Sequence, residues 1–318
     1  MSASVTIVIP CFNQGRFLRD AIDSARTSRI RPEIIVVDDG STDDTRAVAD
    51  AAGAVCISQQ NAGLAAARNR GLEAAGGDFI VFLDADDTLL PGGLDAGAAA
   101  LLEQEDRGLA WGRAVTMDEG GALLETPSPP RIEGDHHRAL LTNNFIWTPA
   151  AAMMRTAFVR RAGGFGCGFD AAADYDLYLR LTREHPACDH GRVVAAYRRH
   201  AANMSGNAAR MLRDTLVVVE RNRPEPGPLE DAWRQGRRMW KDFYGTQLVE
   251  EMRRDLRAGE GARVWRKTLV LARLAPGVLR REAHKKALVM LGRRQAGRAT
   301  PAADISPPRR RADTASGN

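Results

Sequence analysis

The sequence predicts an α/β fold: a mainly parallel sheet with helices on both faces, followed by a C-terminal helical region. Three short apolar runs, Val5–Pro10, Ile34–Val37 and Phe79–Leu83, have the length and the β-branched content of buried strands. Segments of helical spacing separate them, and strands that alternate with helices form parallel sheets. The third run stops at Asp84-Ala85-Asp86-Asp87, which puts three carboxylates where such sheets usually bind ligands.

The other elements follow in order along the chain. A proline-rich loop, Thr126–Pro130, separates two groups of them. The expected ranges are helices over Phe17–Thr27, Gly63–Ala74, Leu94–Gln104 and Asp174–Glu184, strands over Ala54–Ser58, Leu109–Met117 and Arg192–Tyr197, and a strand that runs into a short helix over Met153–Phe158. From Ala208 onward we expect arginine-rich helices with a Pro/Gly break at Arg223–Leu229, and from about residue 298 a disordered tail.

Composition is that of an ordinary soluble protein of 318 residues, with 44% hydrophobic and 27% charged residues. Cys11, Cys56, Cys167 and Cys188 lie far apart without zinc spacing, which is typical of reduced, mostly buried thiols in a cytosolic protein. The N-terminus runs straight into the first strand, so we expect no signal peptide. No apolar run approaches the roughly 20 residues that span a bilayer. We therefore expect a cytoplasmic protein, soluble or peripheral on the inner face of the cytoplasmic membrane.

Positive charge is concentrated in the last third of the chain, although the net charge is only +5. Apolar residues such as Trp265 and Leu269 alternate there with Arg and Lys. This pattern fits a basic amphipathic helix on an anionic membrane surface, and it equally fits a packed helix bundle with a solvated cationic face. Nucleic acid is not expected, because no recognised binding module accompanies the charge. The cations are Arg253, Arg254, Arg257, Arg263, Arg266, Lys267, Arg273, Arg280, Arg281, Lys285, Lys286, Arg293 and Arg294.

Polar groups follow each of the three strong strands. The first strand ends in Pro10-Cys11-Phe12-Asn13, the second in Asp38-Asp39, and the third in Asp84-Ala85-Asp86. The chain contains neither GxGxxG after its first strand nor GxxxxGK[ST], which argues against a dinucleotide-binding or P-loop protein. A crevice with carboxylates but no glycine-rich cradle needs Mn²⁺ or Mg²⁺ to hold a diphosphate. The alternative is a solvated acidic turn that caps the next helix.

Four segments resemble the nucleotide-binding half of an inverting GT-A glycosyltransferase of the family 2 type: residues 5–13, 36–43, 61–69 and 82–87. A fainter resemblance continues to about residue 205 through Gly163-Gly164-Phe165, Asp174–Arg180 and Tyr197–His200. The resemblance implies a nucleotide-sugar-binding half over 1–115 and an acceptor-binding, catalytic half over 116–207. A basic helical region over 208–297 and the tail over 298–318 carry no motif that we can name.

The resemblance also assigns nucleotide-binding residues. Pro10 and Phe12 would line the pocket for the base and ribose, with Asn13 beside them. Asp39 would accept a hydrogen bond from the imino group of uracil or thymine, unless it only caps the following turn. Arg68 would approach the nucleotide or its phosphates, although as a helix residue it could equally be a solvated charge.

Asp84-Ala85-Asp86 would be the DxD motif of the family. Asp86 is expected to bind the metal, Asp84 to make ribose or water-mediated contacts, and Asp87 to shape the turn. His200 would be a further metal ligand beside the diphosphate. His136 and His137 are adjacent, but no other residue stands at a spacing that would make a site with them, and we assign them no role.

The catalytic base would be Asp174, which matches the aspartate of the family's Glu-Asp pair. The glutamate of that pair is replaced here by Ala173, a departure that leaves Asp176 as an alternative base. The expected reaction is metal-dependent transfer of a hexosyl-type sugar from a nucleotide diphosphate, such as a UDP-sugar, to a hydroxyl acceptor with inversion. The acceptor would be a saccharide, a lipid-linked saccharide or another glycoconjugate precursor, as in polysaccharide biosynthesis. Two alternatives are a catalytically impaired nucleotide-sugar-binding protein and a sugar-phosphate nucleotidyltransferase.

Overall fold

The computed structural model describes residues 3–124, 132 and 134–284. Three predictions lie outside these residues: the proline-rich loop Thr126–Pro130, the end of the basic region over 285–297, and the tail over 298–318.

A mixed sheet of nine strands forms the centre of the described part of the chain, in the order β3-β2-β1-β4-β8-β6-β9-β5, with β7 paired to β6. The first four strands in this order are parallel, as predicted. β8 is antiparallel to both of its neighbours, and β6 and β9 are parallel to each other. The strands are β1 Val5–Cys11, β2 Glu33–Asp38, β3 Val55–Ser58, β4 Phe79–Phe82, β5 Thr88–Leu89, β6 Leu109–Met117, β7 Leu123–Leu124, β8 Ala152–Arg155 and β9 Ala187–Arg198.

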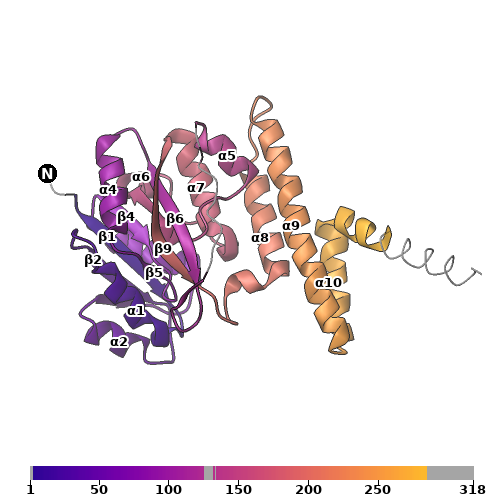
Figure 1. Ribbon diagram of the computed structural model, residues 1–318, viewed down its shortest axis with the longest axis horizontal. Helices are drawn as coiled ribbons and strands as arrows, with labels where there is room; N and C mark the ends of the chain where they lie inside the picture. The colour runs from indigo at the N-terminus through magenta and orange to yellow at the C-terminus, as the bar shows by residue number, and fades with distance from the viewer. Residues whose placement is uncertain (1–2, 125–131, 133, 285–318) are drawn as a thin grey trace, which may run out of the picture.

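Helices cover both faces of this sheet, as predicted. Figure 1 shows α4 on one side of β6 and β9 and α7 on the other, with α8, α9 and α10 stacked beyond α7. The helices are α1 Gly15–Ala25, α2 Thr45–Ala51, α3 Leu64–Ala74, α4 Gly93–Glu103, α5 His136–Thr142, α6 Thr156–Arg161, α7 Ala173–Glu184, α8 Ala208–Arg221, α9 Glu230–Arg257 and α10 Gly261–Leu274, with 3-10 turns η1 Pro149–Ala151, η2 Asp170–Ala172 and η3 Met204–Gly206.

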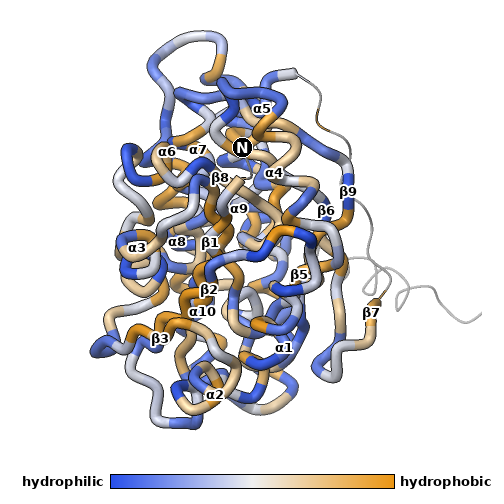
Figure 2. The backbone as a smooth tube through the Cα atoms, turned by 90° about the vertical axis from the view of Figure 1, so that its left-hand side faces the viewer, coloured by the Kyte–Doolittle hydropathy of each residue, from blue (hydrophilic) through white to orange (hydrophobic). Residues whose placement is uncertain are grey.

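The core lies around the parallel strands. Every residue of β1 is buried, and Figure 2 shows β1 and β2 as hydrophobic segments inside the molecule. Helix α3 packs directly on β1, because a Cβ added to Gly71 would lie 2.2 Å from Cγ1 of Val8. This close approach fixes the N-terminal part of α3 at the carboxyl ends of the parallel strands.

The observed elements differ from the predicted ones in two respects. β9 begins at Ala187, five residues before the predicted Arg192, because Ala187–Asp189 already pair with Leu109–Trp111 of β6. The short strands β5 and β7 and helix α5 were not predicted, since segments of two to seven residues carry too little periodicity.

The C-terminal helices dock on the sheet domain through α5. A Cβ on Gly236 of α9 would clash with the carbonyl oxygen of Leu141 in α5, so the two backbones meet at this glycine. Nε1 of Trp233 in α9 donates to the carbonyl oxygen of Val219 in α8 at 2.7 Å. The predicted break between these helices is confirmed, because α8 ends at Arg221 and α9 begins at Glu230. Among the described helices, none has the length and apolar character to cross a bilayer.

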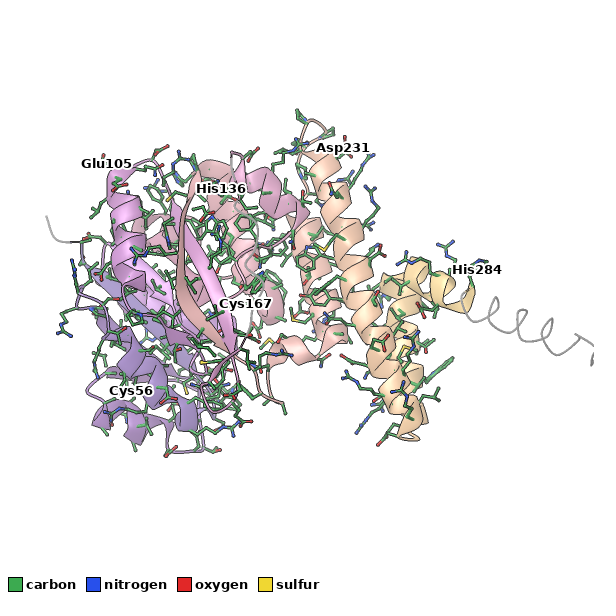
Figure 3. All side chains as sticks on the ribbon, in the orientation of Figure 1. Cys56, Glu105, His136, Cys167, Asp231 and His284 are labelled. Carbon is green, nitrogen blue, oxygen red and sulfur yellow. The ribbon has the colours of Figure 1, made fainter. Side chains whose placement is uncertain are left out.

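All four cysteines are free thiols. Cys11 and Cys188 are buried, and burial raises the pKa of each to about 11, which keeps both protonated and unreactive. Cys56 is partly buried and Cys167 is exposed, so the expected burial holds for only half of the set (Figure 3).

Candidate active site

A cavity of 960 Å³ opens at the carboxyl ends of β1, β2 and β4. Each of these strands delivers polar or aromatic groups into it: Phe12 follows β1, Asp39 follows β2, and Asp84 and Asp86 follow β4. The cavity continues past Asp174 of α7 to side chains of α8 and α9. The predicted residues that line it are Pro10, Phe12, Asp39, Arg68, Asp84, Asp86 and Asp174.

Asp39 is buried at the end of β2 and holds the loop that leads into α3. Its Oδ1 accepts hydrogen bonds from Nε2 of Gln59 (2.7 Å) and the backbone N–H of Ala62 (2.9 Å). Its Oδ2 accepts from the N–H of Gly63 at 2.9 Å, and among the described residues no second donor binds this oxygen, which has a further lone pair. The carboxylate is thus fixed in place and can accept one more hydrogen bond from a ligand in the cavity.

Arg68 lies buried in α3 and forms an ion pair with Asp84. Its Nη2 donates to Oδ1 of Asp84 at 2.6 Å, and its guanidinium lies 5.2 Å from the ring centre of Phe165. Its buried Nε has no hydrogen-bond partner among the described residues. Arg68 is therefore not a solvated helix charge, and its side chain lines the cavity from α3.

Asp86 and His200 lie together behind the DxD turn. Nε2 of His200 donates to Oδ2 of Asp86 at 2.8 Å, since Nδ1 of the same ring accepts from the N–H of Ala202 at 3.3 Å. Gln14 and Asn203 donate to the same oxygen of Asp86 at 3.2 and 3.4 Å. Burial raises the pKa of Asp86, and the nearby Asp84 charge raises it further.

These groups fit a divalent cation in part. Oδ2 of Asp86 and Nε2 of His200, 2.8 Å apart, are joined by a hydrogen bond, so both could bind a cation only in the tautomer with the ring proton on Nδ1. Asp86 lines the cavity, whereas His200, with 1% of its side chain exposed, does not. Within the described residues, no group of three or more His, Cys, Asp or Glu side chains is arranged to hold a metal. Protein groups alone would thus complete only part of a coordination shell, and diphosphate oxygens and water would supply the rest.

Asp174 lines the cavity from the first turn of α7. Burial raises the pKa of its carboxyl group, and the negative charge of Asp84 adds to this effect, whereas the positive charge of Arg68 opposes it. A carboxylate with a raised pKa is a better proton acceptor near neutral pH. Ala173, where the family carries glutamate, is fully buried at the start of the same helix.

Asp176, the alternative base, is not among the cavity-lining residues. It is fully buried on α7, and its Oδ2 accepts from Nε of Arg180 at 2.8 Å. Its Oδ1 accepts from Nδ2 of Asn222 at the end of α8, at 2.9 Å. Two residues along a helix turn a side chain by about 200°, so Asp176 joins α7 to α8 and does not share the cavity with Asp174.

Asn13 also does not line the cavity. It adopts a φ of 54° in the turn after β1, and its Oδ1 accepts from the N–H of Thr42 at 2.8 Å, while its own N–H donates to Oγ of Ser41 at 3.0 Å. Asn13 therefore clamps the loops after β1 and β2 together instead of presenting its amide to a ligand.

Asp87 also bonds to residues outside its own turn. It is fully buried, and its carboxylate accepts from Oγ1 of Thr148 (2.7 Å) and from the N–H of Arg198 (3.0 Å). The guanidinium of Arg198 donates in turn to the carbonyl oxygen of Asp86 at 2.8 Å. This junction ties the ends of β4 and β9 together, which brings His200 to Asp86.

His136 packs in an aromatic cluster at the start of α5, 6.4 Å from the ring centre of Trp111 and 6.2 Å from that of Phe145 (Figure 3). The sequence assigned it no role, and it does not line the cavity.

Sequence reasoning missed the part of the cavity that the C-terminal helices build. Residues of α8 and α9 line it together with Trp147 of the loop before η1. Their sequence signal is weak, because aromatic and methionine residues at helical spacing are usually core. The residues are Arg210, Met211 and Thr215 of α8, and Met239, Trp240, Phe243 and Tyr244 of α9.

The mixed sheet with its acidic turn after β4 and its cavity over the strand ends defines a GT-A glycosyltransferase fold. Residues 6–163 match the family model described as Glycosyl transferase family 2. We conclude that the chain carries a family 2 glycosyltransferase domain.

Similar proteins agree with this assignment. The glycosyltransferase GlyA of Streptococcus pneumoniae serotype 4 is 38% identical over 96 residues, which are 26% of this chain and 13% of GlyA. The chain thus spans a small part of that relative. The structure of S. aureus TarS 1-349 in complex with UDP-GlcNAc superposes with a TM-score of 0.55 at 15% identity, covering 76% of this chain and 71% of that one. The mannosyltransferase PcManGT from Pyrobaculum calidifontis, in complex with GDP-Man and Mn²⁺, gives a TM-score of 0.55 at 16% identity, over 87% and 82% of the two chains.

Proposed function

We propose that the protein transfers a hexosyl-type sugar from a nucleotide diphosphate donor, a UDP-sugar, to a hydroxyl acceptor with inversion at the anomeric carbon. The observation that carries the proposal is the convergence of Asp39, the Arg68–Asp84 pair and Asp174 on one cavity. The matched family supports glycosyl transfer, whereas the donor, the inversion and the metal are part of the proposal.

The donor would bind along the ends of β1, β2 and β4. Phe12, with 48% of its surface exposed, offers a ring face to the base, and the free lone pair of Asp39 suits the imino N–H of uracil. The guanidinium of Arg68, which lines the cavity, suits a phosphate or ribose oxygen. The solved TarS complex with UDP-GlcNAc supports a uridine donor, and the PcManGT complex keeps GDP-sugars as the alternative to be tested.

Asp86 and His200 would hold Mn²⁺ or Mg²⁺ together with the diphosphate. When bound, such an ion neutralises negative charge on the departing nucleoside diphosphate. The ion in the PcManGT complex supports this part of the proposal. The protein's own part is to keep Asp86 and His200 adjacent, which the Asp87–Arg198 junction does.

Asp174 would act as the general base. The acceptor oxygen forms its bond to the anomeric carbon while the bond from that carbon to the diphosphate oxygen breaks, and the hydroxyl proton passes to the Asp174 carboxylate. Nucleoside diphosphate leaves with the bonding electron pair. A single displacement of this kind inverts the anomeric centre, and it needs one base on the acceptor side, which Asp174 supplies.

A thermal-shift panel of nucleotide sugars with and without Mn²⁺ tests the donor part. We expect UDP and one or more UDP-sugars to raise the melting temperature in the presence of Mn²⁺, and slow release of UDP from the matching donor. Absence of metal-dependent stabilisation by every nucleotide would overturn the proposal. Stabilisation by GDP alone would transfer it to GDP-sugars.

Two alternatives stay open to experiment. A binding protein without turnover would be stabilised by a donor but would consume none with any acceptor. Its main support is Ala173, yet that residue is buried and the cavity-lining carboxylate next to it is retained. A sugar-phosphate nucleotidyltransferase would release pyrophosphate from a nucleoside triphosphate and a sugar phosphate.

An anionic membrane surface is the proposed partner of α10. Trp265 and Leu269 are exposed by 64% and 51% of their surfaces, and Arg266 and Arg273 lie exposed beside them. Lys267, on the opposite face, is bound by Glu251 (2.8 Å) and Asp255 (2.7 Å) of α9. One face of α10 thus packs on α9, and the other presents apolar and cationic side chains, as interfacial helices do.

A further inference from the structure

The C-terminal helices form an apolar wall of the candidate active site. On α9 the four lining residues Met239, Trp240, Phe243 and Tyr244 follow the spacing i, i+1, i+4 and i+5, which is one face of a helix. Met211 of α8 lies on the same cavity. We call these five residues the aromatic wall. The aromatic wall belongs to the cavity that Asp174 also lines. In the proposed function, Asp174 activates the acceptor from this end of the cavity.

The position of the wall is fixed by tight packing. Gly236 lies one turn before Trp240, and its backbone meets Leu141 of α5 where no Cβ would fit. Trp240 and Tyr244 stack with ring centres 5.4 Å apart and an interplanar angle of 11°. The wall is therefore a preformed surface.

The polar atoms of the wall are used inside the protein. Nε1 of Trp240 donates to the hydroxyl of Tyr175 at 3.5 Å, and that hydroxyl donates to the carbonyl oxygen of Leu140 at 2.6 Å. The side chain of Thr215, which also lines the cavity, lies near the hydroxyl of Tyr244. Apart from this hydroxyl, the wall offers carbon and sulfur atoms to a ligand. Recognition of a sugar ring would need free hydrogen-bonding groups in addition to an aromatic face.

Part of the wall is exposed to solvent. Phe243 leaves 49% of its surface exposed, and Trp147, which lines the same cavity, leaves 44%. Covering apolar surface of this kind removes it from water, which stabilises a complex. Methionine side chains adapt to ligands of irregular shape. A ligand with an apolar part would gain from the wall in addition to any contacts that its polar part makes with Asn143, Asn144 and Arg210 of the same cavity.

We propose that the acceptor is an amphiphile, whose reacting hydroxyl is carried on an apolar aglycone that binds against the aromatic wall. This inference deepens the proposed function and rests on it for the assignment of the cavity end next to Asp174 as the acceptor side. It selects, among possible hydroxyl acceptors, lipid-like glycosides and alcohols over free saccharides.

The test is calorimetric titration of the whole protein, without donor, using octyl β-D-glucoside below its micelle concentration and glucose as the matched polar probe. We expect octyl glucoside to bind at least tenfold more tightly than glucose. Phe243→Ser should weaken octyl glucoside binding at least fivefold and leave the affinity for UDP unchanged. Val217→Ser is the control, because Val217 is an equally exposed apolar residue of α8 (45%) that does not line the cavity.

Two results would overturn the inference: equal affinity for glucose and octyl glucoside, or unchanged octyl glucoside binding in Phe243→Ser. Since half of Phe243 is already in solvent, the variant is expected to fold, and UDP binding checks that it does. If the unmodified protein does not bind UDP, that result counts against the proposed donor site and not against the amphiphilic acceptor. Failure of the proposed function and failure of this inference are therefore distinguishable.

Discussion

Nη2 of Arg68 donates to Oδ1 of Asp84 at 2.6 Å, and this buried ion pair lies in the same cavity as the carboxylate of Asp174. The charge of Arg68 lowers the pKa of Asp174, while burial and Asp84 raise it. Arg68 thus connects Asp84, on the proposed donor side, with the proposed base Asp174 on the proposed acceptor side.

Replacing Arg68 by Met should shift the acidic limb of the pH profile of donor consumption toward higher pH. The reason is that the positive charge favours ionised Asp174, so its removal raises the pKa of the base, and a base acts only when deprotonated. The measurement is kcat as a function of pH. Arg70→Met, at an exposed position of the same helix, should leave the profile unchanged, and an unshifted limb in Arg68→Met would refute the coupling.

Asp86→Ala should remove the dependence of UDP affinity on Mn²⁺. The variant deletes one of the two proposed protein ligands, so we expect UDP binding in Mn²⁺ to weaken about tenfold, which corresponds to about 1.4 kcal/mol. Titration of UDP with Mn²⁺ and with EDTA measures this effect. Asp50→Ala, an exposed carboxylate of α2, is the control. Full Mn²⁺ dependence in the Asp86 variant would mean that the metal binds elsewhere.

Asp87→Asn should become more stabilising relative to the unmodified protein as pH rises. Burial, followed by the charges of Asp86 and Asp84, raises the pKa of Asp87 well above its ordinary value. The unfolded carboxyl loses its proton near pH 4, so between that pH and the folded pKa the ionisation costs folding energy that asparagine avoids. Thermal unfolding from pH 4 to pH 8 follows the difference in melting temperature. A difference that stays constant with pH would contradict the assignment.

The sequence predicted the cavity-lining residues at the strand ends better than those of the C-terminal helices, for a physical reason. Phe12, Asp39 and Asp84 follow strands, and parallel strands bring their carboxyl ends together whatever the loops do. Asn13 was misplaced because its positive φ turns the side chain toward Thr42, which a residue pattern does not encode.

Long-range packing determined which of the remaining predicted residues line the cavity. The resemblance favours Asp174 over Asp176 as the base, and the docking of α8, which brings Asn222 to Asp176, separates the two side chains in space. The aromatic wall was not predicted, because the contact of Gly236 with Leu141 joins segments almost a hundred residues apart. Pattern and resemblance together therefore gave the fold class, and tertiary contacts decided which residues share the cavity.

The exposed face of α10 should bind anionic vesicles. Each cation near the lipid contributes about 1 kcal/mol, and Trp265 and Leu269 add apolar contact. Flotation with phosphatidylglycerol-containing vesicles should recover the protein, and the double variant Trp265→Ser/Leu269→Ser should reduce recovery severalfold, with Val217→Ser as the control. Equal recovery of the double variant and of Val217→Ser would count against membrane binding. Self-association through α10 in sedimentation experiments would also count against it.

The most direct test of the account is donor turnover by Asp174→Asn. We predict that this variant binds UDP in Mn²⁺ as tightly as the unmodified protein and loses donor consumption about a hundredfold or more, the usual contribution of a general base. Asp176→Asn, which weakens a buried ion pair outside the cavity, should instead unfold at lower temperature and keep the turnover of the protein that remains folded. Full turnover by Asp174→Asn, together with loss of turnover in folded Asp176→Asn, would contradict the assignment of the base and the acceptor side with it.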